Sequence, residues 1–149
     1  NLIQDWLGQK QTVMPALSAA IVWFAVGFYV LIYLGGLSTV PEELYEAAAV
    51  DGINWWQKLW RITLPLIVQS VTINIIVSTI AILTLFDLPY VLTQGGPGYA
   101  SQTMALMSYQ YAFKAMSQGK AMAMAVMLTL ITVVFAVAEL FVLNRKSSD

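Results

Sequence analysis

The sequence predicts an all-α integral membrane protein with three transmembrane helices. Of its 149 residues, 59% are hydrophobic and only 10% are charged, whereas a soluble domain carries about 25% charged residues. The charges are also unevenly distributed, because residues 11–41, 62–86 and 121–138 contain no Asp, Glu, Lys or Arg. A helix needs roughly 20 apolar residues to cross the hydrocarbon core of a bilayer, and each of these stretches reaches or approaches that length.

The predicted spans cover residues 14–37, 62–86 and 119–143. The second span contains Pro65, which lacks a backbone N–H and should kink the helix. A short amphipathic helix at residues 1–8 is expected to lie in the membrane interface before the first span.

The connection between the first two spans, residues 39–61, is polar and shows signals for two short helices. The first should run over residues 40–50 and end at Gly52, because glycine adopts the left-handed conformation at little cost. A second helix should follow and continue into the second span. Capping boxes, in which a side chain and a backbone amide pair reciprocally, are predicted for Thr39 with Glu42 and for Asn54 with Gln57.

The connection between the second and third spans is rich in proline and glycine. A lipid-exposed backbone of this kind would leave amide groups unpaired in hydrocarbon. We therefore expect it to lie outside the hydrocarbon core or to be covered by protein, with a short helix at residues 103–116 after it. Its marked residues are Pro89, Gly95, Gly96, Pro97 and Gly98.

The composition excludes several kinds of chemistry. The chain has no Cys and no His, so disulfides, thiolate nucleophiles, imidazole metal sites and Ser-His-Asp triads are ruled out. A net charge of −1 argues against a nucleic-acid partner, and no phosphate-binding loop occurs. We expect no metal and no cofactor. A membrane-embedded enzyme would depend on Asp87 and Glu139, which are expected near opposite ends of different spans.

One long motif resembles a known family. The pattern Glu-Ala-Ala-x3-Gly-x9-Ile-x-Leu-Pro is the cytoplasmic signature loop of bacterial binding-protein-dependent ABC importer permeases. The flanking residues, and the segment FDLPYVLTQGGPGYASQT, resemble the carbohydrate-uptake (maltose-type) branch of that family. In this sequence the motif is formed by Glu46, Ala47, Ala48, Gly52, Ile62, Leu64 and Pro65.

The resemblance implies that residues 1–149 are the C-terminal part of one permease transmembrane domain, with the last three of about six helices. Such a multi-pass subunit lies in the bacterial inner membrane and moves a sugar or sugar-like solute by alternating access. Its implied partners are a cytoplasmic ABC ATPase dimer, a second and different permease subunit, a solute-binding protein and membrane lipid. The alternatives are a non-transporting membrane scaffold or a membrane-embedded enzyme.

The resemblance also assigns roles within the coupling loop, residues 39–61. Glu46 would meet a basic group on the ATPase, Ala47 and Ala48 would allow close seating in a groove, and Gly52 would turn the chain. Asp51 offers a second negative charge to a basic partner.

Candidate residues for the solute path lie on two spans. On the second span Ser70, Asn74 and Ser78 recur every four residues and so share a helix face. They suit recognition of hydroxyl groups, and the alternative interpretation is hydrogen bonding between helices. Tyr29 and Tyr33 share a face of the first span and could stack on a sugar, or could simply pack at the interface.

The outer loop with Gly95, Gly96 and Pro97 lies on the side opposite the coupling loop if the spans alternate. By resemblance it would contact the solute-binding protein or form a lid at the outer mouth. The alternative is a Gly/Pro turn that re-enters the next helix.

Overall fold

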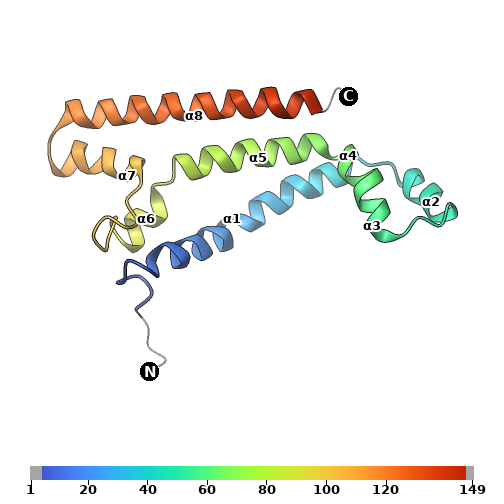
Figure 1. Cartoon of the computed structure of the whole chain (residues 1–149), viewed down its shortest axis with the longest axis horizontal. Helices are drawn as coiled ribbons and strands as arrows, with labels where there is room; N and C mark the ends of the chain where they lie inside the picture. Colours follow the sequence, from blue (N-terminus) through green and yellow to red (C-terminus); the bar gives the residue numbers. More distant parts are fainter. Residues whose placement is uncertain (1–4, 147–149) are drawn as a thin grey trace. The chain divides into compact units, whose positions relative to one another are not determined.

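The computed structural model describes residues 5–146, and over this part of the chain all regular structure is helical (Figure 1). The prediction of an all-α chain is therefore confirmed for these residues. The helices are α1 (Val13–Leu37), α2 (Glu42–Val50), α3 (Trp55–Lys58), the π-helix η1 (Leu59–Thr63), α4 (Leu64–Leu66), α5 (Val68–Leu83), α6 (Asp87–Leu92), α7 (Met104–Tyr109), the π-helix η2 (Gln110–Lys114) and α8 (Gln118–Lys146).

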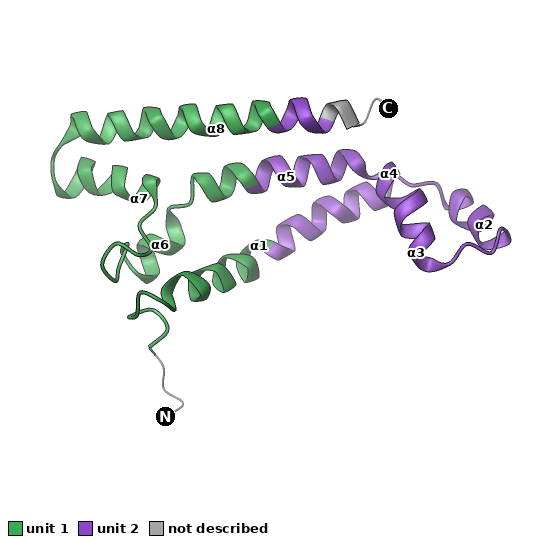
Figure 2. Cartoon of the chain, in the orientation of Figure 1, with its two compact units in different colours: residues 1–25, 79–138 green, residues 26–78, 139–149 purple. Residues whose placement is uncertain are grey.

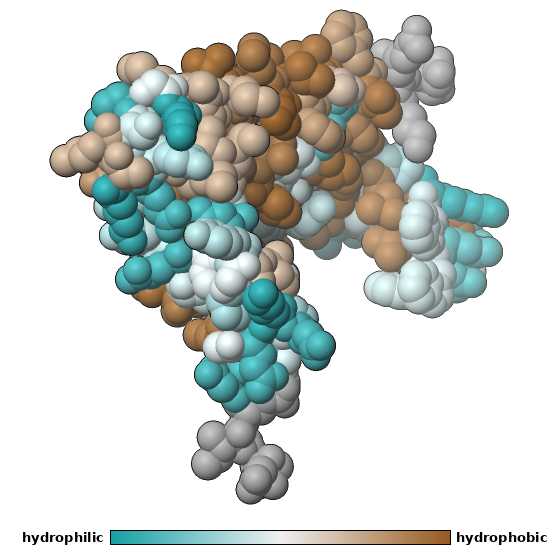
Figure 3. All heavy atoms as spheres, turned by 60° about the vertical axis from the view of Figure 1, so that its left-hand side comes forward, coloured by the Kyte–Doolittle hydropathy of each residue, from teal (hydrophilic) through white to brown (hydrophobic). Residues whose placement is uncertain are grey.

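Three helical segments are long and apolar enough to cross a membrane: Val13–Leu37, Val68–Leu92 and Gln118–Leu143. Only 6%, 6% and 0% of their most apolar windows are buried within the chain. Figure 3 shows hydrophobic residues gathered over the long helices and hydrophilic residues over the connecting segments. Apolar surface of this extent needs lipid or other protein to cover it, which agrees with the predicted membrane class.

The second span begins later than expected. The sequence places its start at residue 62, but the long helix α5 starts at Val68. Ahead of it the chain forms the π-helix η1, the short helix α4 with Pro65, and a break at Ile67 (φ −97°, ψ 13°). A proline removes one helical hydrogen bond and its ring crowds the preceding turn, so the predicted distortion takes the form of a wider turn followed by a break.

The predicted interfacial helix at residues 1–8 is not found where the structure can test it. Residues 6–12 form turns and a bend in place of a helix, and residues 1–4 lie outside the described part. The Gly8 amide donates to the Asp5 carboxylate (2.8 Å), and the Thr12 hydroxyl donates to the Trp6 carbonyl (2.9 Å). These local side-chain bonds offer the backbone an alternative to helical pairing.

The chain divides into two compact units (Figure 2). Unit 1 comprises Asn1–Ala25 and Thr79–Ala138, and unit 2 comprises Val26–Ser78 and Glu139–Asp149. Unit 2 therefore holds the α2–α3 connection, and unit 1 holds the proline- and glycine-rich connection with α7 and η2.

Within unit 2, α1 and α5 approach closely at Gly36. A Cβ atom added to Gly36 would lie 2.7 Å from the Cβ of Ser70 and would also overlap its hydroxyl oxygen. A Cβ added to the neighbouring Gly35 would meet nothing within 4 Å. Only a glycine at position 36 permits this contact, because the small residue lets the two backbones come together.

We expect Gly36→Ala to destabilise the detergent-solubilised protein by about 1–3 kcal/mol, because the added methyl group overpacks the contact with Ser70. Gly35→Ala is the matched control, and it should leave stability unchanged or raise it, since alanine favours helix over glycine by about 1 kcal/mol. Thermal unfolding of the two variants measures the difference. Equal melting temperatures for the two variants would contradict the close approach.

Candidate functional site

The connection between α1 and α5 begins with a cap different from the one predicted. The Thr39 hydroxyl donates to the Gly36 carbonyl (2.7 Å) and so satisfies the end of α1 instead of opening α2. Pro41 occupies the N-cap of α2 without a side-chain hydrogen bond. The predicted Thr39–Glu42 capping box is therefore wrong. The acidic first turn, with Glu42 and Glu43, still complements the helix dipole.

The turn after α2 confirms the conformation predicted for Gly52. Gly52 has a φ of +70°. The Ile53 amide donates to the Ala48 carbonyl (3.0 Å), and the Gly52 amide donates to the Ala49 carbonyl (3.2 Å). These two bonds form a Schellman motif, which satisfies carbonyls at the helix end.

The next helix begins with the predicted capping box. The Gln57 amide donates to the Asn54 side chain (2.9 Å), and the Asn54 amide donates to the Gln57 side chain (3.2 Å). The chain therefore passes from α2 to α3 with its turn closed by hydrogen bonds on both sides. Such a connection holds the two short helices in a defined relation.

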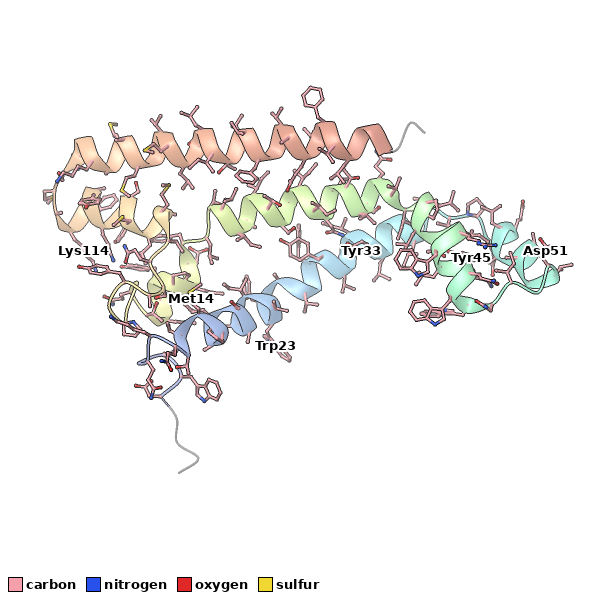
Figure 4. The ribbon with its side chains drawn as sticks, in the orientation of Figure 1. Met14, Trp23, Tyr33, Tyr45, Asp51 and Lys114 are labelled. Carbon is pink, nitrogen blue, oxygen red and sulfur yellow. The ribbon has the colours of Figure 1, made fainter. Side chains whose placement is uncertain are left out.

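The residues assigned to the coupling role are mostly exposed. Glu46, Ala47, Asp51 and Gly52 are accessible, whereas Ala48 is only 3% exposed. Of the two alanines, only Ala47 is thus available to a partner surface. Figure 4 labels Tyr45, which belongs to α2, and Asp51, which caps the end of that helix.

A contact that the sequence did not reveal joins α2 to the helix leading into α5. The Tyr45 and Thr63 hydroxyls share a hydrogen bond of 3.1 Å, and Thr63 is 8% exposed. The ammonium of Lys58 lies 5.5 Å from the centre of the Tyr45 ring, close enough for a cation–π contact. The sequence offers one hint of this contact, because both residues adjoin the long motif. Tyr45 precedes Glu46, and Thr63 lies between Ile62 and Leu64.

The polar residues of α5 do not form one uniform stripe. Asn74 is 4% exposed, and its amide nitrogen donates weakly to the Tyr29 carbonyl (3.5 Å). Its carbonyl oxygen is buried and has no hydrogen-bond partner among the described residues. Ser70 lies against Gly36, and the Ser78 hydroxyl donates to the Ile75 carbonyl within its own helix (2.8 Å).

The two tyrosines of α1 are half-buried. The Tyr29 ring packs edge-on against Phe28 with a centroid distance of 5.6 Å, and its backbone, not its hydroxyl, meets Asn74. Tyr33, labelled in Figure 4, makes no side-chain hydrogen bond with any residue in the described range. Of the predicted solute-path residues, the structure therefore brings Tyr29 and Asn74 together.

The proline- and glycine-rich connection of unit 1 is a compact, hydrogen-bonded turn. Ser101 is 3% exposed, and its hydroxyl donates to the Gly96 carbonyl (2.6 Å) and pairs with the Thr93 hydroxyl (2.7 Å). Gly95 is buried with a φ of +90°, and Gly96 and Pro97 are half-buried. Most of this loop is therefore packed inward.

An aromatic cluster lies beside this turn in unit 1. The Tyr109 ring contacts Tyr90, Phe86 and Phe113 with centroid distances of 5.1, 5.2 and 5.0 Å. The hydroxyls of Tyr90 and Tyr109 pair at 3.4 Å. This hydrogen bond is the main reason that the pKa of Tyr109 is raised above its usual value of 10.0, with the Coulombic effect of Tyr90 and desolvation adding to it. Tyr109 therefore stays neutral at physiological pH.

The two carboxylates considered for an enzymatic role belong to different units. Asp87 is exposed at the start of α6 in unit 1, whereas Glu139 is half-buried in α8 and belongs to unit 2. Within residues 5–146 no group of three or more His, Cys, Asp or Glu side chains is arranged to hold a metal ion.

Comparison with known sequences identifies the class of protein. Residues 2–146 match a family described as "Binding-protein-dependent transport system inner membrane component". The chain belongs to this family of membrane transport components, and the resemblance carried by the Glu46–Pro65 motif is confirmed.

The curated relatives are permeases. A putative ABC transporter permease of Caldicellulosiruptor sp. is 40% identical over 128 residues, covering 86% of this chain and 91% of that protein. The diacetylchitobiose uptake system permease of Streptomyces coelicolor is 40% identical over 141 residues, which cover 94% of this chain and 40% of that protein. The trehalose/maltose transport system permease of Thermococcus litoralis is 39% identical over 107 residues, which cover 72% of this chain and 36% of that protein. The chain spans most of the first relative but less than half of the other two.

We expect Tyr45→Phe to loosen α2, because it removes the hydroxyl bonded to Thr63 and keeps the ring. The loss should be about 0.5–1.5 kcal/mol, visible as faster hydrogen exchange of the α2 amides. Tyr33→Phe is the control, since its hydroxyl has no partner among the described residues. In a double-mutant cycle with Thr63→Val the two effects should not add. Additive effects would mean that the hydroxyl pair is not a stabilising interaction.

Proposed function

We propose that this chain is a transmembrane permease subunit of an ABC importer that moves a sugar or sugar-like solute across the bacterial inner membrane. Transport proceeds by alternating access, and a separate ATPase subunit drives it. The observation that carries the proposal is the hydrogen-bonded α2–α3 connection, which presents Glu46, Ala47, Asp51 and Gly52 of the family signature at its surface.

In this proposal α2 is the element on which a cytoplasmic ATPase dimer acts. Glu46 pairs with a basic group on the ATPase, and Asp51 adds a second negative charge. Ala47 permits close seating because its side chain is a single methyl group. Ala48 is buried, so it serves by packing α2 onto its own unit, and Gly52 fixes the turn.

Through the Tyr45–Thr63 contact, a displacement of α2 acts directly on η1, the helix that leads toward the membrane span. Thr63 closes η1, and α4 connects η1 to α5. A push on α2 therefore acts on α5 through side chains as well as through the connecting backbone. The spans then shift between two packed arrangements, one open to the inside and one open to the outside.

The two connections face opposite sides of the membrane, because one span separates them. The α2–α3 connection faces the cytoplasm, where Lys58 and Arg61 agree with the preference of cytoplasmic loops for basic residues. The connection with Gly95, Gly96 and Pro97 faces outward. Because most of it is packed inward, it contacts a solute-binding protein through its exposed residues, such as Gln94.

The family's description as binding-protein-dependent supports a soluble receptor as a partner. The largely exposed apolar spans leave surface for lipid and for a second permease subunit, which we propose to be a different chain. Relatives named for diacetylchitobiose and for trehalose/maltose transport support a carbohydrate cargo.

Asn74 is the strongest candidate for the solute path. An unpaired buried carbonyl costs about 1–3 kcal/mol, and a solute hydroxyl would satisfy the Asn74 oxygen when α1 and α5 separate during transport. Tyr29 adjoins it, and Tyr33 lies one turn further along α1. Ser70 and Ser78 contribute less, because one packs against Gly36 and the other is bonded within its helix.

Gly52→Leu should uncouple ATP hydrolysis from uptake. No atom lies within 4 Å of an added Cβ, so the effect comes from backbone strain of about 1–2 kcal/mol in the left-handed conformation. We expect uptake per ATP hydrolysed to fall about tenfold in proteoliposomes that contain the complete transporter. Gly52→Asn, which tolerates this conformation, should retain coupling. Full coupling in Gly52→Leu would count against the role of this turn.

Asn74→Leu should weaken uptake or change which sugar is preferred, because the path loses an amide that can pair with a hydroxyl. Thr72→Val is the control, since the Thr72 hydroxyl donates to the Val68 carbonyl of its own helix (2.9 Å). Competition uptake with a panel of labelled sugars measures the change. Identical rates and preferences in Asn74→Leu would remove Asn74 from the path.

A further inference from the structure

Unit 1 contains an open hollow of about 550 Å³ beside η2. Its volume falls in the range of about 300–1,000 Å³ that is typical of small-molecule sites. Its lining residues belong to neither α1 nor α5, which carry the proposed solute path. Lys114, one of its lining residues, is labelled in Figure 4. The polar residues that line it are Tyr99, Gln102, Gln110, Tyr111 and Lys114.

One side of the hollow is helical. Met107, Gln110, Tyr111 and Lys114 all line the hollow and come from two consecutive helices, α7 and η2. The last three belong to the π-helix η2. A π-helical turn costs stability relative to an α-helix and is found frequently at functional sites.

The two amides of the hollow are held in place. Gln102 donates from its side-chain nitrogen to the Gln110 side-chain oxygen (2.9 Å), and Gln110 donates to the Gln94 carbonyl (3.2 Å). The hydroxyls of Tyr99 and Tyr111 and the ammonium of Lys114 bond to no other residue in the range that the structure describes. The hollow therefore combines fixed amides with three polar groups that are free to bind a ligand.

Tyr99 is held in an unusual conformation. Its φ is +64°, a region that bulky side chains rarely adopt, and its side chain is 77% exposed. Strain of this kind persists where the position of a side chain matters. Lys120 lies 5.7 Å from the centre of the Tyr111 ring and covers it, so Tyr99 offers the more accessible aromatic face.

We propose that this hollow is a binding subsite for a neutral carbohydrate or polyol at the outer end of the protein. A sugar ring stacks on Tyr99, and its hydroxyls bond to the Gln102 and Gln110 amides, the Tyr111 hydroxyl and Lys114. This subsite rests on the proposed function and holds solute between its release from the binding protein and its entry to the path along α1 and α5. Neutral groups outnumber the one lining cation, which favours a polyhydroxyl ligand over an acidic peptide.

The test uses a single introduced cysteine, because the chain has none. Ala115→Cys places a thiol in the lining of the hollow, and Gln11→Cys, exposed ahead of α1 and outside the hollow, is the control. Each variant is assembled with its partner subunits in proteoliposomes and labelled from the outer side with a membrane-impermeant thiol reagent. Uptake of maltose, trehalose and diacetylchitobiose is measured first, and the best transported sugar is the probe.

We expect the probe sugar alone to slow labelling of Ala115→Cys about fivefold at concentrations well above its Kd, with no change for Gln11→Cys. In the same background Tyr99→Gly, which suits the positive φ and removes the ring, should raise the half-protecting concentration about fivefold. Sugars that are not transported should protect poorly.

Three results would overturn the subsite: labelling unaffected by the transported sugar, labelling possible only from the inner side, or protection by ligand-free binding protein alone. The last would mark the hollow as a protein contact surface. In these cases sugar uptake by the parent transporter continues, so the proposed function stands. If the parent takes up none of a broad sugar panel, the proposed carbohydrate cargo and the subsite both fail.

Discussion

The structure depends on pairing every backbone polar group wherever the chain leaves a helix close to hydrocarbon. An unpaired amide or carbonyl in lipid costs several kcal/mol, so each break needs an internal partner. Short hydroxyl side chains supply many of them. Ser38 and Thr39 donate to the last carbonyls of α1, Thr103 caps α7, and Ser101 with Thr93 closes the turn around Gly96. These irregular segments are therefore held by side-chain hydrogen bonds at the points where the helices end.

The sequence predicts the features that depend on local chemistry. Charge-free runs locate the three long helices because crossing hydrocarbon requires apolar length, and Gly52 and Asn54 mark a turn and a cap through their own conformational preferences. Thr39 shows the limit of this reasoning. Its hydroxyl can serve either the end of α1 or the start of α2, and the path of the chain decides between them.

Features that join distant residues could not be predicted. Tyr45 and Thr63 are 18 positions apart, and neither has a periodicity that relates it to the other. The hollow beside η2 arises because a loop residue, Tyr99, meets a helical face whose spacing is widened by a π turn. For Asn74 both earlier interpretations persist, since one end of its amide contacts α1 and the other remains unpaired.

The contact between Gly36 and Ser70 limits how α1 and α5 can move. One turn before Gly36 lies Ile32, and sliding either helix along its axis would bring a full side chain to a place where only hydrogen fits. Tilting about the contact, in contrast, keeps Gly36 opposite Ser70. The pair is thus suited to rocking around a fixed fulcrum near the end of α1, with the largest excursions at the ends of the two helices that lie farthest from it.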